Sequence, residues 1–236
     1  MTALFFNFFF RLSTSFVLVQ TEVFNELLKT HVDTLGNVDY QGLAKDQDQL
    51  EVYLTFLDHS KPQEHWSNHK KKAFWINTYN AYTLYLILKE EETKSINNII
   101  KGTTNAWNIP FVKVGGKSMT LDFIEHQILR KELFDPRIHV GVNCASASCP
   151  KLANFAFTEE NVDETLEALM FAFINDPKRN KIEKNDIEIS QIFSWFQEDF
   201  TKDGNLIDYL NRYSRIKINS SAKVRFLPYN WNLNGN

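Results

Sequence analysis

Apolar residues recur along most of the chain at the three- and four-residue spacing of amphipathic helices, and shorter alternating stretches lie between these segments. Turn-forming pairs such as Gly36-Asn37 and Asp176-Pro177 separate the segments. The pattern predicts helices over residues 22–32, 44–58, 68–90, 121–132, 161–175, 190–200 and 206–213.

Strands are predicted to be few and short. Gly115-Gly116 joins residues 111–114 to residues 117–119 in the pattern of a hairpin. Further strands are predicted over residues 137–143, 181–183, 186–189 and 223–227. Because helices outnumber strands and do not alternate with them regularly, the expected fold is α+β, a helix-rich single domain with a small, mostly antiparallel sheet.

The helix predicted over residues 68–90 follows Ser67, a residue type that caps helix N-termini. It is apolar nearly all round over residues 73–88, which predicts a central, buried helix. Asn77 and Asn80 project from neighbouring positions of this helix, and a buried amide must find hydrogen-bond partners. They are expected either to hold a loop in place or to belong to a binding site.

The composition supports one sizeable core, with 43% hydrophobic and 14% aromatic residues in a chain of 236. The formal net charge is -3, and the longest basic run is Lys70-Lys71-Lys72. Since nucleic-acid binding normally needs a clustered basic face, no nucleic-acid partner is expected.

Residues 1–20 form an apolar N-terminal segment ahead of a domain that we place at residues 21–236. Residues 4–19 resemble the core of a signal peptide, interrupted by Arg11 and without an obvious cleavage site. The same residues could instead associate with a membrane or begin a cytoplasmic domain. Export to the periplasm or tethering to a membrane is slightly favoured over a cytoplasmic location.

Glu125 falls near the apolar face of the helix predicted over residues 121–132, so it should be partly buried. A buried carboxylate requires a cation or several donors, and Arg137 is the nearest candidate in the sequence. His126 and Arg130 share the flank of the same helix. A structural salt bridge and a functional site both remain open for this group.

In the strand predicted over residues 137–143, alternation places Arg137, His139, Gly141 and Asn143 on one face. The opposite face is apolar and belongs to the core. The polar face is expected to line a cleft or to meet the helix that carries Glu125.

Cys144 follows this strand and begins a turn of small residues that ends at Cys149-Pro150. Ser146 and Ser148 are candidate binding residues here, because the turn exposes N–H groups that could bind an anion or stabilise an oxyanion. Cys144 is a candidate nucleophile. The rise per residue of a strand and a helix brings neither candidate base, His139 nor His126, within reach of it.

The two cysteines could form a small disulfide or remain free. Their C-x4-C spacing matches neither the C-x2-C of redox sites nor zinc-finger spacing. We therefore predict no metal site and no cofactor.

Four ordered motifs resemble the DUF547 family, a group named only as a domain of unknown function. They are residues 73–81 (Ala-Phe-Trp-Ile-Asn-Thr-Tyr-Asn-Ala), 124–130 (Ile-Glu-His-Gln-Ile-Leu-Arg), 135–150 (Asp-Pro-Arg-Ile-His-Val-Gly-Val-Asn-Cys, ending in Ser-Cys-Pro) and 229–234 (Tyr-Asn-Trp-Asn-Leu-Asn). In the last motif, Asn230 stands where the family pattern has Asp.

The resemblance implies a single compact domain, which in bacteria stands alone and is often exported, and which in plants and animals is appended to other modules. It brings no established reaction. Eukaryotic relatives keep a cysteine at the position of Cys144 and often have serine at that of Cys149, which makes Cys144 the better functional candidate.

Two hypotheses for the function stay open. In the first, the protein is a domain that binds a small molecule or a protein, with a polar network of Glu125, His126, Arg137 and His139. In the second, it is a thiol-dependent hydrolase or acyltransferase with Cys144 as nucleophile, His126 or His139 as base, and Glu125 or Asn77 as orienting group. A redox role for the cysteine pair is a third, lesser alternative.

Overall fold

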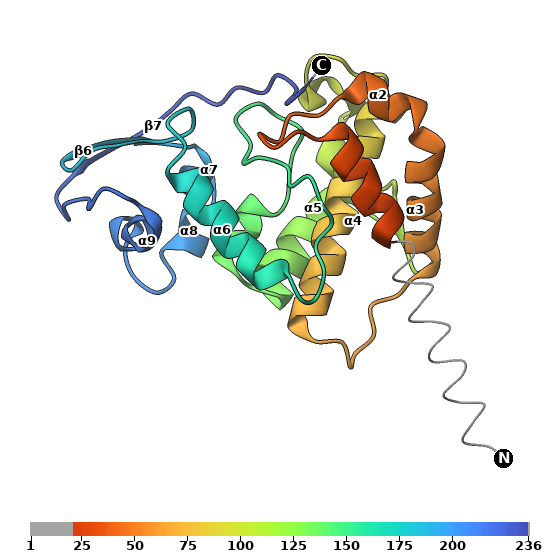
Figure 1. Ribbon diagram of the computed structural model, residues 1–236, viewed down its shortest axis with the longest axis horizontal. Coiled ribbons are helices and arrows are strands. Elements are labelled where there is room, and N and C mark those ends of the chain that lie inside the picture. Colours follow the sequence, from red (N-terminus) through yellow and green to blue (C-terminus); the bar gives the residue numbers. More distant parts are fainter. Residues whose placement is uncertain (1–20, 236) are drawn as a thin grey trace.

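The computed structural model describes residues 21–235, and helix α4 (Asn68–Lys89) runs through the middle of the molecule (Figure 1). The central, buried helix is thus confirmed. The Ser67 side chain accepts a hydrogen bond from the Lys70 amide at 3.1 Å, as a cap does. Ile76, Tyr79 and Leu86 on this helix are each no more than 1% exposed, so α4 forms the centre of the core.

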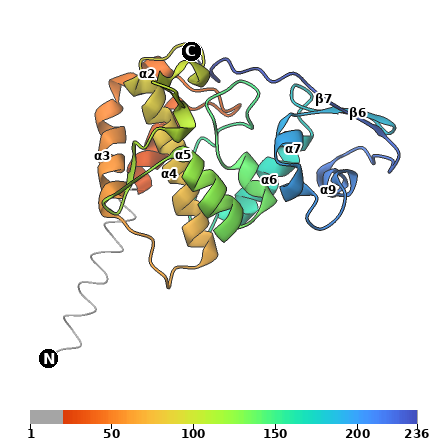
Figure 2. The ribbon, with the colours of Figure 1, turned by 180° about the vertical axis from the view of Figure 1, so that it is seen from behind.

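The other helices surround α4 and extend to one side of it (Figures 1 and 2). Residues 21–31 are helical. The remaining helices are α2 (Tyr40–Lys45), α3 (Gln47–His59), α5 (Leu121–Phe123), α6 (Val162–Ile174), α7 (Ile192–Trp195), α8 (Gln197–Phe200) and α9 (Leu206–Tyr213), with the short 3₁₀ turns η1 (Ile96–Asn98) and η2 (Ala106–Asn108).

Three small sheets occur among residues 21–235. They are β1 (Ile100–Lys101) with β2 (Thr104–Asn105), β3 (Val112–Val114) with β4 (Lys117–Met119), and β5 (Lys181–Ile182) with β6 (Asp186–Ile189) and β7 (Lys223–Phe226). All pairs are antiparallel except β6–β7, which is parallel. The α+β fold class is confirmed, although the strands form separate sheets rather than one.

The region predicted as a helix over residues 121–132 is helical, but only its first turn is an α-helix. Thr120 caps α5 by accepting a hydrogen bond from the Phe123 amide at 2.9 Å. From Ile124 to Glu132 the chain continues as a π-helix, η3, whose end is marked by the bond from the Leu133 amide to the Ile128 carbonyl. Such wide turns often occur at functional sites.

The prediction of a strand over residues 137–143 is wrong. Residues Pro136–Val140 form the 3₁₀ helix η4, because Pro136 presets the backbone for a helix start and the Asp135 side chain accepts from the Arg137 amide at 2.9 Å. Ile138, His139 and Val140 are all buried, so there is no alternation between an apolar and a polar face.

The next residue, Gly141, is packed tightly between two helices. A Cβ atom at this position would lie 2.9 Å from Leu166 of α6 and 3.0 Å from Ile76 of α4. This close approach explains the glycine and holds the following segment, residues 142–150, against α4.

The segment that follows β7 runs back across the molecule and ends beside α2 (Figures 1 and 2). The Tyr40 hydroxyl donates to Asn234 Oδ1 at 2.8 Å, and Val38 and Gly235 form a parallel bridge. Residues 229–235 therefore form a C-terminal strap that ties the two ends of the described chain together.

The predicted export signal or membrane anchor at residues 4–19 lies outside the described residues and stays a prediction. Among residues 21–235, no helix is both long and apolar enough to cross a membrane.

Candidate functional site

A cavity of about 270 Å³ lies between α4, the π-helix η3 and the C-terminal strap. All four residues predicted to carry catalysis, Glu125, His126, His139 and Cys144, line it. The helix that carries Glu125 and His126 and the segment that carries His139 and Cys144 therefore meet at this cavity, although the rise per residue predicted that Cys144 lies out of reach of both histidines. The reason is that residues 136–140 coil into η4 and do not extend the chain away from η3.

The turn that begins at Cys144 is held by the C-terminal strap. The Ala147 amide donates to the Asn232 carbonyl at 2.7 Å, and the Ser148 amide donates to the Asn230 carbonyl at 3.2 Å. The Ala145 amide donates to Asn143 Oδ1 at 2.9 Å. These three N–H groups were expected to be available as oxyanion donors. They instead donate hydrogen bonds within the protein, so they are not free to bind an oxyanion.

The Cys144 thiol lies among three groups that can donate hydrogen bonds to it. They are the Cys149 thiol, the Ser146 hydroxyl at 3.1 Å from Cys144 Sγ, and the Tyr229 hydroxyl at 3.3 Å. The hydrogen bond from Cys149 contributes most to lowering the pKa of Cys144, to about 7, whereas burial acts in the opposite direction. A large fraction of Cys144 is therefore thiolate near neutral pH.

The neighbours of Cys144 keep their own protons. Burial raises the pKa of the Cys149 thiol, and burial together with the two nearby thiols raises that of Tyr229. The Ser146 and Tyr229 hydroxyls lie 2.9 Å apart, so either can donate to the other or to the sulfur. Ser146, Tyr229 and Cys149 therefore form a set of proton donors around one sulfur atom.

His139 is fixed by Asp199, a residue of α8. His139 Nε2 lies 2.7 Å from Asp199 Oδ2, and Arg130 contacts the same carboxylate through Nε at 2.6 Å and through a second nitrogen at 3.0 Å. Hydrogen bonds from His139 and Arg130 lower the pKa of Asp199 to about 2 against the effect of its burial, so it is a carboxylate and accepts.

The imidazole of His139 is 3% exposed and stacks on Phe196 with ring centroids 4.1 Å apart. Burial lowers the pKa of His139, which keeps the ring neutral at neutral pH. Because Nε2 donates to the Asp199 carboxylate, the lone pair of this neutral ring is assigned to Nδ1. His139 therefore has the proton arrangement of a general base oriented by an acid.

His126 differs from His139 in this respect. Its Nδ1 accepts a hydrogen bond from Arg130 at 2.8 Å, because a guanidinium can only donate. The proton of a neutral His126 ring is therefore on Nε2, which lies 3.5 Å from Asp122 Oδ1. His126 thus has no lone pair to offer the cavity, which makes His139 the better candidate base.

Glu125 does not pair with Arg137, contrary to the expectation from the sequence. Its pKa is raised, chiefly by burial, while His126 and a hydrogen bond with Tyr79 act in the lowering direction. Glu125 is only 8% exposed. The carboxyl lies at the floor of the cavity, and its environment favours the protonated form more than water does.

Arg137 belongs to a separate charge cluster outside the cavity. It donates to Asp135, Asp163 and Glu167, and the buried Lys72 donates to Asp135 at 2.6 Å. Arginine and lysine together lower the pKa of Asp135 to about 2 against the effect of its burial. This cluster joins α4, η4 and α6, so Arg137 acts on the fold rather than in the cavity.

The amides predicted at a possible binding site all bond to the backbone. Asn77 exchanges two hydrogen bonds with Phe157, at 2.8 and 2.9 Å. Asn80 donates to the Gly141 carbonyl at 2.9 Å and accepts from the Asn143 amide at 2.8 Å. The Asn143 side chain in turn donates to the Pro150 carbonyl at 2.8 Å. These amides position the Cys144 turn against α4.

The rim of the cavity is aromatic and comes largely from the part of the chain that no catalytic prediction covered. Trp195 of α7 stacks on Trp231 of the strap with centroids 5.7 Å apart, and Tyr229 lies 4.6 Å from Trp231. Trp107 meets Trp231 edge to face at 5.8 Å. The position of Tyr229 and Trp231 in the closing motif was a signal for them, but Asp199 had none.

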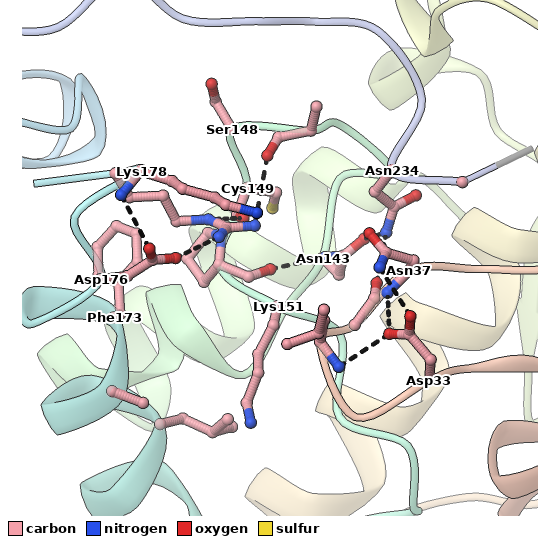
Figure 3. Close-up of a pocket in the computed structure, with 18 of the residues that line it drawn as sticks. Asp33, Asn37, Asn143, Ser148, Cys149, Lys151, Phe173, Asp176, Lys178 and Asn234 are labelled. Atoms are coloured by element: carbon pink, nitrogen blue, oxygen red, sulfur yellow. Dashed lines mark hydrogen bonds and ion pairs between the residues drawn. The ribbon is translucent and has the colours of Figure 1, made fainter.

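A larger cavity, of about 880 Å³, lies on the other side of the turn, and Cys149 lines both cavities (Figure 3). Arg179 reaches this side of the turn and donates to the Cys149 carbonyl at 2.7 Å while it pairs with Asp176. Lys151 and Lys178 also line this cavity. Asp33 and Asp176 line it as well, so its charge is mixed. Cys144 does not line it, so the smaller cavity is the candidate site.

No group of three or more histidine, cysteine or acidic side chains among residues 21–235 is arranged to hold a metal ion. The prediction of no metal site and no cofactor stays a prediction.

Cys144 and Cys149 are free thiols, with the Cys144 amide donating to Cys149 Sγ at 3.2 Å. We expect oxidised glutathione to join them. The Cys144 thiolate attacks it and releases one glutathione thiolate, and Cys149 then displaces the second. The intact mass should fall by two hydrogens.

The matched control for this oxidation is Cys149→Ser, which should stop at the mixed disulfide and gain the mass of one glutathione. A wild-type protein that keeps the glutathione adduct would contradict the expected pairing.

One family model matches the chain, over residues 63–174, and it is described as a protein of unknown function, DUF547. No curated protein and no solved structure matches the chain. The matched segment contains α4, η3, η4 and the Cys144 turn, whereas Asp199 and the strap lie beyond it. The motifs that resemble this family agree with the match, and the match over residues 63–174 supports the assignment of this segment to the DUF547 family.

Proposed function

We propose that the protein binds a small organic molecule in the 270 Å³ cavity and acts on it through the Cys144 thiolate, as a thiol-dependent hydrolase or acyltransferase. One observation carries this proposal: a cysteine whose pKa is lowered to about 7 lines the same cavity as a histidine oriented by a carboxylate. Nucleophile, base and orienting acid are the three roles that such chemistry requires.

In the proposed reaction, the Cys144 sulfur attacks an acyl carbon and forms a thioester, and the bond to the leaving group breaks. Where Cys144 is protonated, its proton passes to His139 Nδ1 and then to the leaving alcohol or amine; where Cys144 is a thiolate, the leaving group takes its proton from water. Water or an acceptor amine then attacks the thioester and gives a proton to His139, the carbon–sulfur bond breaks, and His139 returns this proton to the sulfur or to water. The hydrogen bonds of Cys144 Sγ go to Ser146 and Tyr229, so the proton crosses the cavity through substrate or water.

Tyr229 is the donor that we assign to the developing oxyanion. The backbone amides of Ala145, Ala147 and Ser148 are engaged elsewhere, but the Tyr229 hydroxyl lies 3.3 Å from Cys144 Sγ. Its raised pKa keeps it protonated at neutral pH. A tyrosine hydroxyl can serve in place of a backbone amide at such a site.

A non-catalytic domain that binds a ligand or protein is the second candidate. It is favoured by the mutual saturation of the polar groups beside the cavity, since Arg130, Asp199 and both histidines already bond to one another. Satisfied polar networks are commonly structural. In this case the cavity would bind its ligand without a covalent step.

The reactivity of Cys144 separates the two candidates. We expect iodoacetamide to alkylate Cys144 with a midpoint near pH 7, following the lowered pKa. At about pH 6 the rate should exceed that of a free model thiol roughly fivefold, because the larger thiolate fraction outweighs the weaker intrinsic nucleophilicity. Rates are followed by the mass of the Cys144 peptide.

Tyr229→Phe removes one donor to the thiolate and should move the midpoint upward by about one pH unit. Tyr85→Phe makes the same chemical change outside the cavity and should leave the midpoint in place. Alkylation slower than that of the model thiol, with a midpoint at about 8.5, would contradict the catalytic proposal. The non-catalytic binding domain would then be the favoured candidate.

A further inference from the structure

The small cavity combines aromatic walls with acidic groups. Trp195, Trp231 and Tyr229 pack on one another at its rim, with the Trp195 and Tyr229 centroids 4.8 Å apart, and Trp107 meets Trp231 edge to face. Phe196 stacks on His139. Asp122 and Glu125 also line it. Aromatic faces carry negative electrostatic potential, so walls and carboxyl groups act in the same direction.

Positive side chains are missing from this lining. Among residues 21–235, no lysine or arginine lines the cavity. The nearest one, Arg130, is turned to Asp199, His126 and the face of Phe196. The larger cavity on the far side of the turn differs from it, because Lys151, Lys178 and Arg179 line that one together with Asp33 and Asp176 (Figure 3). Lysine and arginine side chains are therefore present in the larger cavity and absent from the lining of the smaller one.

From this juxtaposition of aromatic rings and carboxyl groups, we infer that the cavity selects a substrate with a small organic cation, an alkylammonium or quaternary ammonium group. The group lies against Trp195 and Trp231 and beside the side chains of Asp122 and Glu125, of which Glu125 attracts a cation fully only when it is ionised. A cation also gains from the Cys144 thiolate, which an anionic substrate would meet with repulsion.

The size of the cavity agrees with a small cationic group. At about 270 Å³ it lies just below the range of about 300–1,000 Å³ that is common for ligand sites. Trp195 is 48% exposed, so the rim is open to water on one side. A larger molecule can therefore insert a cationic end while the rest of it stays outside.

This inference rests on the proposed function, since it names the substrate class of the same site. The probe is choline, and its control is 3,3-dimethylbutan-1-ol, which has the same shape without the charge. Isothermal titration calorimetry of the full chain should show choline binding at least about tenfold more tightly than the alcohol. Equal binding of the two, or no saturable binding of choline, overturns the inference.

Two substitutions test the walls and the charge separately. Trp195→Leu and Asp122→Asn should each weaken choline binding by about threefold or more. Trp66→Leu removes a tryptophan outside the cavity and should leave the affinity unchanged. Choline binding that neither cavity substitution weakens would place the probe elsewhere and overturn the inference.

The two proposals fail in different ways. A fast-alkylating Cys144 in a protein that does not distinguish choline from the alcohol would overturn the cationic substrate class and leave the thiol chemistry. A slow-alkylating Cys144 in a protein that binds choline selectively would overturn the thiol chemistry. If both hold, saturating choline should slow the alkylation of Cys144, because both lie in one cavity.

Discussion

Replacing Asp199 by asparagine is expected to lower the free energy of unfolding by about 3 kcal/mol, because it removes the charge that balances Arg130 beside a buried imidazole. The Asp199 side chain is 11% exposed and the side chains of Arg130 and His139 are 21% and 2% exposed. An asparagine oxygen in the place of Asp199 Oδ2 can accept from His139 Nε2 and Arg130 Nε, but its amide group then faces the second donor of Arg130.

Urea unfolding of the variant at neutral pH measures this change. Asp203→Asn is the matched control, since Asp203 is exposed in the turn after α8 and should tolerate the change within about 0.5 kcal/mol. The His139 pKa should also fall further in Asp199→Asn, because the carboxylate that raises it is gone. Equal stability of the variant and the wild type would show that Arg130 and His139 do not depend on Asp199.

Double substitution of Arg130 and Asp199 tests the same pair without leaving a lone charge. Arg130→Gln together with Asp199→Asn should be less destabilising than the sum of the two single changes, with a coupling of about 1–3 kcal/mol. Additive effects would mean that the two side chains contribute independently, although their atoms lie 2.6 Å apart.

The sequence pattern predicted correctly those elements whose stability depends on residues within the element itself. The helix α4 could be predicted because its apolar positions, residues 73–88, span about four turns and Ser67 caps it, and each signal is contained in the segment itself. The prediction of a strand over residues 137–143 was wrong because it also used only the pattern within the segment. Alternating residue types also occur in η4, where Pro136, the Asp135 cap and contacts of Gly141 with distant helices decide the backbone.

The candidate site was predicted in part, because its residue types stood close together in the sequence. Glu125, His126, His139 and Cys144 lie within 20 positions and do line one cavity. Their partners could not be predicted in this way. Asp199 lies 60 positions from His139, and Tyr229 lies 85 positions from Cys144, so only the folded chain shows these pairs.

This separation has a consequence for the family. The matched segment, residues 63–174, contains Cys144 and His139, the proposed nucleophile and base, but Asp199 and most of the aromatic rim come from residues 195–231. The C-terminal strap also occupies the amides of the Cys144 turn. The chemistry available to Cys144 therefore depends on a part of the chain that the family model does not cover.

The free energy of unfolding is expected to fall by roughly 5 kcal/mol as the pH drops from about 5 to about 1, because two buried carboxylates must be protonated. The pKa values of Asp135 and Asp199 are both lowered from 3.8 to about 2. A carboxyl whose pKa is lower in the folded state stabilises the protein above its unfolded pKa. This contribution is lost as the pH falls through the folded pKa, and each group accounts for roughly 2.5 kcal/mol.

Two other buried groups act at higher pH and in opposite directions. The raised pKa of Glu125 means that the folded state gains stability as the pH falls toward 4.5. The lowered pKa of His139 means that the folded state loses stability as the pH falls below 6.5. The effect of Glu125 ends below its unfolded pKa of 4.5, whereas that of His139 continues down to its lowered folded pKa. The aspartate variants are therefore needed to identify the part of the loss that belongs to Asp135 and Asp199.

Urea unfolding at about pH 5, 4 and 3 measures the loss, and Asp135→Asn and Asp199→Asn identify its origin. Each variant starts from a lower stability, because Lys72 with Arg137, or Arg130 with His139, loses its anionic partner. Below about pH 4, however, each should lose only about half as much as the wild type, because one of the two titrating carboxyls is absent. Asp203→Asn should follow the wild type. An unfolding free energy that stays constant from about pH 5 to about pH 3 would show that the ion pairs of both aspartates are matched in the unfolded chain.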